Sequence, residues 1–297
     1  MNKTIVTGLI GLSAFFMFSC KKSDPLPTFE TLTDFFNQNT TTGTSYTVNV
    51  DTDADTLVTA NGNTFIFPVG SFNKSGDVTV VIKELTNVSE LVLTNKPNQI
   101  DSTFNKNAVM FEVSSSDVTF NAAKSYKVIF NNNKFAYNQV SVWRDNSWIY
   151  DNSYAVASSS PNAGDAPSIF SSGNTTEIVT NKFGTFAAST NPNIGTKNTK
   201  IKIKVYGFVT DKDVNAYVIS GSDNAVNAAK RITDSEFVSD SVAVGSSLKI
   251  VCMSFSQKYK YAGFAQVFVK DTLTVPVSMH EVTDNNTLKS EVINYLK

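Results

Sequence analysis

The stretch NTFIFPVGSFNKSGDVTVVIKEL, residues 63–85, places two short runs of β-branched and aromatic residues on either side of a turn-rich segment. The first run stops at Pro68, and proline ends or bulges a strand because it lacks the N–H that a sheet ladder needs. Similar runs occur on both sides, at 45–50 (SYTVNV), 109–115 (VMFEVSS) and 125–130 (SYKVIF). Short strands separated by frequent turn signals are typical of an antiparallel β-sandwich. The sequence therefore predicts an all-β fold.

Residues 86–107 interrupt this rhythm of strands and turns. Within them, VSELVLTN at 88–95 has no period-two pattern. We expect a helical turn or a crossover loop over one end of the sandwich.

A resemblance to a known family rests on the order of residues in the opening stretch. Gly62 to Phe72 reads glycine, apolar strand, proline, small residue and phenylalanine, and Gly76 to Glu84 reads glycine, valine-rich strand and glutamate. This order resembles the β-sandwich domain of ankyrins and netrin receptors (ZU-type), which surface lipoproteins of Bacteroidetes-type bacteria also carry. The resemblance covers residues 45–132 and implies a fold, not a catalytic set.

The next segment, 133–194, is expected to be a hairpin followed by a linker. QVSVWRDNSWIY at 139–150 alternates apolar and polar residues about a turn at 144–147, which is typical of a hairpin. The following 152–176 is rich in serine, asparagine and alanine with little apolar periodicity. We expect it to form a long surface loop or linker.

A second sandwich is predicted over 195–297. Ile201, Ile203 and Val205 alternate with lysines, so one face of that strand is expected to be buried and the other wet. The resemblance to Bacteroidetes-type lipoproteins implies an immunoglobulin-like domain at this place. A C-terminal helix is predicted at 286–296, with a cap at Asn286 or Thr287 and its apolar face packed back on the protein.

The first 19 residues have the layout of a secretory signal segment, with a lysine near the start and then no charged residue up to Ser19. Cys20 follows directly, as in the lipobox of bacterial lipoproteins, which this junction resembles. The resemblance implies that Cys20 carries a covalent lipid that anchors the chain to a membrane. An ordinary signal peptide with an incidental cysteine, or an uncleaved anchor, is the alternative.

Residues 20–44 are expected to form a lipid tether and a short helix. Phe29, Leu32, Phe35 and Phe36 have helical spacing. We expect this helix to be a strap packed on the first sandwich. A surface that grips a partner is the alternative.

Cysteine content and charge limit the functional classes. The only cysteine besides Cys20 is Cys252, in an apolar run, so we expect a buried, inert thiol and no internal disulfide. The formal net charge is −1 and the only two arginines are Arg144 and Arg231. This balance argues against a nucleic-acid partner.

No catalytic residues are predicted. The single histidine, His280, lies alone near the end of a predicted strand, and the chain lacks zinc-type cysteine pairs and a glycine-rich phosphate loop. A carboxylate pair assembled from distant positions is the alternative that the sequence leaves open. Relatives of the ZU-type domain that cleave themselves do so at a histidine followed by phenylalanine or leucine. Here Glu281 follows, so we do not expect self-cleavage by that route.

No metal site is predicted either. Asp51, Asp53 and Asp55 alternate like the start of a calcium loop, but Thr56 stands where that loop needs glycine and Gly62 where it needs glutamate. A solvated turn is the expectation. A looser calcium site between sandwich loops remains an alternative.

An aromatic cluster in the hairpin segment suggests a second hypothesis. Trp143, Trp148, Tyr150 and Tyr154 lie close together, and exposed rings stack on sugars in many extracellular modules. Packing in a core or at a domain junction is the alternative for these residues.

Two functions of different classes follow. The first is a non-enzymatic envelope lipoprotein at the outer membrane that acts as a structural or protein-interaction module for other envelope proteins. The second is a surface module that binds a glycan or another ligand. Lys21 is not the aspartate that accompanies inner-membrane retention of lipoproteins, so we expect the outer membrane. The cell-surface and periplasmic faces both stay open.

Overall fold

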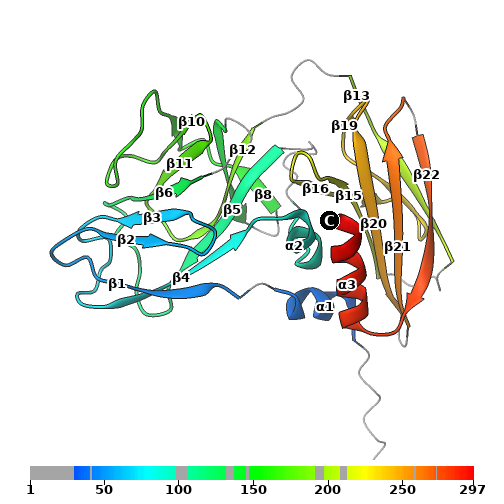
Figure 1. Cartoon of the computed structure of the whole chain (residues 1–297), viewed down its shortest axis with the longest axis horizontal. Coiled ribbons are helices and arrows are strands. Elements are labelled where there is room, and N and C mark those ends of the chain that lie inside the picture. The colour runs from blue at the N-terminus through cyan, green and yellow to red at the C-terminus, as the bar shows by residue number, and fades with distance from the viewer. Residues whose placement is uncertain are drawn as a thin grey trace, which may run out of the picture.

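The fold is all-β, as the sequence predicts. The computed structural model describes residues 30–40, 42–97, 106–131, 137–144, 147–190, 197–207, 213–256, 259–271 and 273–297. Figure 1 shows two β-sandwiches side by side, with helices α1 (Leu32–Gln38) and α2 (Val88–Leu93) between them. Cys20 and the signal segment lie outside the described residues.

The first sandwich consists of two six-stranded sheets. One has the order β1 (Thr44–Val48), β4 (Val78–Leu85), β5 (Lys106–Ser114), β12 (Gly184–Thr190), β7 (Gln139–Arg144), β8 (Ser147–Tyr150). The other has the order β2 (Asp55–Val58), β3 (Thr64–Phe67), β6 (Tyr126–Phe130), β11 (Thr175–Thr180), β10 (Ser168–Ser172), β9 (Ala155–Val156). The opening stretch thus contributes a strand to each sheet, β3 and β4, and β3 ends directly before Pro68 as expected.

Aromatic side chains fill the core between these sheets. Phe111 of β5 stacks on Phe186 of β12 with ring centroids 5.2 Å apart, and Phe67 stacks on Tyr126 at the same separation. All four rings are buried. Offset ring pairs add to the hydrophobic stabilisation that burial alone provides.

The segment that we expected to be a linker differs in the structure. Strands β9 to β12 come from it and belong to both sheets of the first sandwich. Its loop is fixed over the second sheet, because Lys127 Nζ lies 2.9 Å from the Glu177 carboxylate and 3.1 Å from Ser160 Oγ, which in turn donates to Glu177 at 2.6 Å. Composition alone suggests a free loop here because these strands are short and polar.

The second sandwich is a single eight-stranded sheet that folds over on itself. Its order is β16 (Ala225–Ala228), β15 (Val214–Ser220), β20 (Ser247–Ser256), β21 (Tyr259–Phe268), β22 (Leu273–Val282), β14 (Ile201–Tyr206), β18 (Glu236–Val238), β17 (Lys230–Arg231), with β13 (Asn198–Thr199) and β19 (Val242–Ala243) paired separately. Strand β22 changes layers, since 279–282 pair with β21 and 273–278 pair with β14. The β14–β22 and β9–β10 pairs are parallel, which departs from the antiparallel arrangement that we predicted.

A close contact between strands marks the point where β22 changes layers. A Cβ atom on Gly263 would lie 2.6 Å from Met279 Sδ and 2.8 Å from Val277 Cγ1. Only glycine fits this crossing without a shift of β22.

The interior of the second sandwich follows the predicted alternation. Ile201, Ile203 and Val205 of β14 are buried and face Ile250 and Cys252 of β20 across one core. Burial raises the pKa of the Cys252 thiol to about 12, so the thiol stays protonated and inert, as expected.

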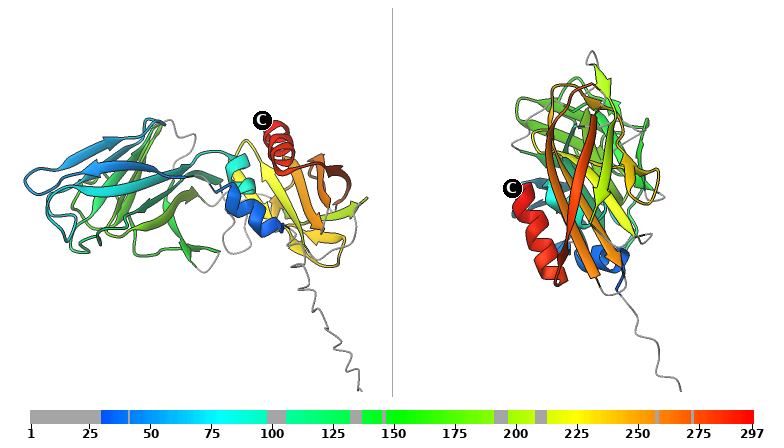
Figure 2. Two further views of the ribbon diagram at one scale, coloured as in Figure 1. Left: turned by 90° about the horizontal axis from the view of Figure 1, so that it is seen from below. Right: turned by 90° about the vertical axis from the view of Figure 1, so that its right-hand side faces the viewer.

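A separate core, here called the junction core, joins the two sandwiches through the helices. Figure 2 shows α1 and α2 between the sandwiches and α3 (Asn285–Leu296) along the second one. The junction core contains Leu32, Phe35, Phe36, Leu85, Val88, Leu91, Val92, Leu93, Met110, Trp148, Ala187, Tyr217, Ile219, Val226, Val251, Met253, Phe255, Ala262, Val282, Leu288, Val292 and Leu296. The short helix predicted within 20–44 is present as α1. For 88–95 the sequence left a helical turn and a crossover loop open, and the structure has a helix there, α2.

Candidate functional site

The chain enters the described structure through α1, whose start is fixed by local hydrogen bonds. Thr31 is the N-cap, and its Oγ1 accepts from the Asp34 amide at 3.1 Å while the Asp34 carboxylate accepts from the Thr31 amide at 2.8 Å. This reciprocal capping box satisfies two amides that the helix cannot pair internally. The bond from the Thr31 amide lowers the pKa of Asp34 below its ordinary value.

Helix α1 packs on the second sandwich, so our prediction of a strap on the first sandwich is wrong. Leu32, Phe35 and Phe36 are buried in the junction core, and the Phe35 ring lies 5.6 Å from that of Phe255 at the end of β20. The sequence gives the apolar face of the helix but not its partner, because Phe255 lies more than two hundred residues along the chain.

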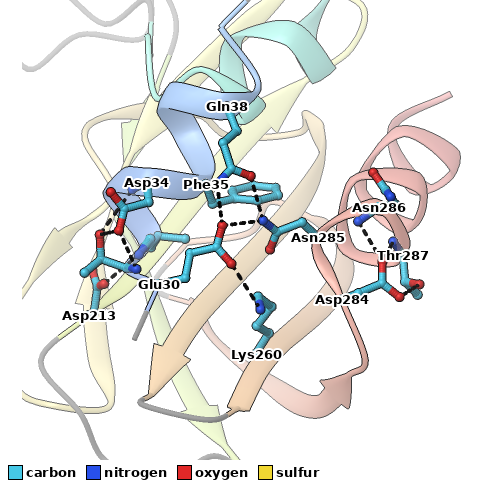
Figure 3. Close-up of polar contacts among 12 residues, drawn as sticks. Glu30, Asp34, Phe35, Gln38, Asp213, Lys260, Asp284, Asn285, Asn286 and Thr287 are labelled. Atoms are coloured by element: carbon cyan, nitrogen blue, oxygen red, sulfur yellow. Dashed lines mark hydrogen bonds and ion pairs between the residues drawn. The ribbon is translucent and has the colours of Figure 1, made fainter. Parts of the chain in front are cut away.

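Polar contacts reinforce this docking (Figure 3). The Leu32 amide donates to Asp213 Oδ2 at 2.9 Å, just before β15 begins. The Glu30 carboxylate lies 3.3 Å from Lys260 Nζ on β21. Asn285, the first residue of α3, donates to Gln38 Oε1 at 2.9 Å and also to Glu30. Residues 30–38 are thus bound to three parts of the second sandwich: the start of β15, strand β21 and helix α3.

The surroundings of Glu30 favour the charged form of its carboxylate. Partial burial disfavours its charge, but hydrogen bonds from Asn285, Lys260 and Gln38 and the positive charge of Lys260 outweigh it. The pKa of Glu30 therefore lies below its ordinary value.

Helix α3 is capped next to this cluster (Figure 3). The cap is Asp284, two or three residues earlier than predicted, and it accepts from the Asn286 and Thr287 amides at 2.8 and 3.0 Å. These bonds, those of Thr287 above all, lower the pKa of Asp284 to about 2. At the other end of α3, Lys249 Nζ donates to the Tyr295 carbonyl at 2.7 Å.

The aromatic residues that we singled out do not form an exposed row. The predicted hairpin is real, with Trp143 opposite Trp148, and their rings meet edge to face at 5.3 Å. Trp148 is buried in the junction core, and Trp143 and Tyr150 pack against it while keeping part of their surface. Tyr154 is buried in the first core, with its hydroxyl 2.5 Å from Thr180 Oγ1. Trp143, Trp148 and Tyr150 therefore pack at a domain junction, and Tyr154 packs in a core, which is the alternative to a sugar-binding row.

The acidic turn is occupied by backbone contacts. Asp51 accepts from the Gly76 amide at 2.7 Å and Asp55 from the Asn49 amide at 3.1 Å. Among the residues that the structure describes, no group of three or more histidine, cysteine, aspartate and glutamate side chains is arranged to hold a metal ion.

The edges of the sheets in the first sandwich carry exposed apolar side chains. Val58 on β2, Ile149 on β8 and Val156 on β9 are 62%, 45% and 66% exposed, and each strand is the last of its sheet. The remaining edge, β1, presents Ser45 and Thr47 to solvent and carries neither lysine nor proline. Sequence reasoning names β1 and β8 but neither β2 nor β9, and it cannot identify any of them as an edge, because strand order is set by distant pairings.

In the described part of the chain, no helix is long and apolar enough to cross a bilayer. Cys20 lies outside the described residues, and so does the proposed lipid attachment. The residues behind the ZU-type resemblance have structural roles: Gly62 has a positive φ of 78°, Phe72 is in the core, and Glu84 accepts from Asn63 at 2.7 Å. Neither a protein-family model nor a curated protein matches this chain.

Proposed function

We propose that this chain is a non-enzymatic envelope lipoprotein, anchored at the outer membrane through a lipid on Cys20, that binds another envelope protein. The observation that supports a protein-interaction role is the set of sheet edges on the first sandwich that pair with no further strand among the described residues. Soluble proteins usually protect such edges with lysine, proline, bulges or covering segments.

Strand β1 is the best candidate for the contact. Its five residues pair on one side with β4, so its other side offers backbone N–H and C=O groups to an incoming extended strand. Strand addition of this kind uses main-chain hydrogen bonds for affinity and tolerates a polar strand such as TSYTV. The short β9 offers only two residues and is the weakest edge.

The glycan alternative has no comparable support. A sugar-stacking surface needs rings that are open to solvent, whereas Trp148 and Tyr154 are buried in two different cores. We therefore propose the interaction role alone.

A matched pair of lysine substitutions tests the edge. Thr47 on β1 and Thr79 on β4 are opposite each other and both exposed, but only Thr47 lies on an edge. With a photo-crosslinking residue at Ser45 in intact cells, we expect one dominant adduct with an envelope protein, lost in Thr47→Lys and kept in Thr79→Lys. Equal adducts in both variants, or none from probes at either Ser45 or Ile149, would contradict the proposal.

The anchor needs a separate test. Cells that express wild type and Cys20→Ala are labelled with palmitate and then treated with protease. We expect label on the wild type only, and digestion of the intact-cell protein distinguishes the cell surface from the periplasmic face. A wild-type protein without label would refute the lipid on Cys20.

A further inference from the structure

The place where the chain enters the fold is one end of the second sandwich. Three pairings locate this end: Val214 at the start of β15 lies opposite Ser254, the end of β20 turns into the start of β21 at Ser256 and Tyr259, and Lys260 lies opposite Val282 at the end of β22. We call this the entry end, and its strand termini are 214, 256, 259 and 282.

Glu30 is held at the entry end from several directions. Its carboxylate contacts Lys260 on β21 and Asn285 at the start of α3 (Figure 3). Two residues later, the Leu32 amide is bound to Asp213 beside the start of β15. The buried Leu32 and Phe35 add apolar contacts to Phe255 and its neighbours, so the position of Glu30 does not depend on one polar bond.

The chain before Glu30 is short. Nine residues lie between it and Cys20, which makes ten steps along the chain, and an extended chain spans at most about 3.3–3.6 Å per step, so Cys20 lies within roughly 36 Å of Glu30. A lipid on Cys20 therefore keeps the entry end within this distance of the bilayer.

We propose that the second sandwich, although it comes last in the sequence, is the membrane-proximal domain, and that its entry end faces the lipid surface. This inference rests on the proposed lipid at Cys20. The first sandwich receives the chain only after α1, so its position relative to the membrane is set through the junction core. Its turn around Ser75 lies at the end away from the junction core, because β4 runs from this turn to Leu85 in that core.

The entry end carries an exposed residue that is suited to contact with a lipid surface. Tyr259 is 44% exposed at the β20–β21 turn, with its ring 6.3 Å from that of Tyr261. Tyrosine is favoured at membrane–water interfaces because its ring is apolar and its hydroxyl is hydrated. Lys260, the lysine that the structure describes at this end, is paired with Glu30.

The test measures depth for three probe positions on the mature chain, residues 20–297. Cys20 is coupled to a maleimide lipid in vesicles of phosphatidylethanolamine and phosphatidylglycerol, since the buried Cys252 does not react. A click-coupled fluorophore is placed at Glu281 near the entry end, at Ser247 at the opposite end of the same sandwich, or at Ser75 on the first sandwich, all exposed. At about 3.3 Å per residue, the strand pairings separate Glu281 from Ser247 by roughly 23 Å.

We expect headgroup-nitroxide quenching to be strongest at 281 and weaker at 247 and 75. Strongest quenching at 247 or 75, or equal quenching at all three, would overturn the inference. Chemical coupling separates this outcome from the proposed function, because cells that leave Cys20 unacylated would refute the anchor without altering the vesicle result.

A variant that releases α1 checks the cause. In Phe35→Ala/Asp213→Ala, made together with Cys252→Ala so that only Cys20 couples to the lipid, the free chain lengthens from Cys20 to the start of β1, and the quenching should become similar at the three positions. Unchanged, position-dependent quenching in this variant, with the sandwiches still folded by circular dichroism, would show that α1 docking does not set the orientation and would contradict the inference.

Discussion

The two sandwiches are buried in different ways. The first encloses one aromatic core between its two sheets, and only one outer face, at Leu85, Met110, Trp148 and Ala187, joins the junction core. In the second, strands β15 and β20 are buried on both faces, by the inner core on one side and by the junction core on the other. A strand layer with two apolar faces cannot be left uncovered in water.

This difference indicates that the second sandwich depends on segments from outside its own range of residues. Helix α1, from the start of the described chain, and α2, from within the first sandwich, cover Phe255, Tyr217 and Val226. The two sandwiches therefore share one packed core through the helices, and the comparison can be tested by loosening each contribution in turn.

The largest effect is expected from Phe35→Ala. Removing a fully buried phenylalanine costs about 3–5 kcal/mol. Because the lost contacts cover the second sandwich, the alkylation rate of Cys252 in a Cys20→Ser background should rise by roughly 10²–10⁴-fold. Phe268→Ala, at a ring 60% exposed in the same sandwich, is the matched control and should change little. If Phe35→Ala leaves the alkylation rate of Cys252 unchanged, α1 is not needed to keep this sandwich closed.

Leu288→Ala should have the next largest effect, about 2–4 kcal/mol, since its side chain is fully buried under α3. Hydrogen exchange followed by mass spectrometry should show faster exchange in α3 and α1 together, because Asn285 links the two helices. Strands β3 and β6 of the first sandwich should stay protected, and Lys289→Ala should match the wild type. Faster exchange in β3 and β6 with α1 unaffected would show that the first sandwich, and not α1, depends on the packing of α3.

A smaller effect, about 1 kcal/mol, is expected from Thr31→Ala, which removes the N-cap of α1. Thr33→Ala lies in the same helix with an exposed side chain and should be neutral or slightly stabilising, because alanine is the better helix former. Urea denaturation of the three proteins measures the difference. If both threonine variants behave alike, the capping box contributes nothing to docking.

The smallest effect is a pH dependence at Glu30. Its folded pKa lies below the ordinary value of 4.5, so its contribution to docking is present above about pH 4.5 and is lost as the pH falls through the folded pKa. Exchange protection of 30–40, corrected for intrinsic rates, should decline in that acid range in the wild type. Glu30→Gln should flatten the decline and Glu281→Gln should not. The same decline in both variants would mean that another group controls it.

The sequence predicts those features that depend on neighbours along the chain. The face of α1 follows from the spacing of Leu32, Phe35 and Phe36, and the aromatic hairpin follows from alternation about its turn. Pro68 ends β3 because of a missing N–H, which is a local property.

The errors concern partners that are distant in sequence. Asp213 lies just before β15, and its carboxylate holds the Leu32 amide 181 residues away, a contact that the sequence does not predict. The polar strands β10 and β11 look like linker because their burial comes from the pairing of β11 with β6 and of β10 with β11 and from the Lys127–Glu177 contact, none of which composition reveals. The open edges of the first sandwich could not be predicted for the same reason.

The docking of α1 also has a mechanical consequence. A pull on the N-terminus reaches Glu30 and the Asp213 contact before it reaches any strand. If α1 yields first, the chain from Glu30 to the start of β1 at Thr44 supplies about 50 Å of slack at most, while both sandwiches stay closed. Helix α1 would then protect both sandwiches from a brief pulling force, because it detaches first and docks again when the force ends.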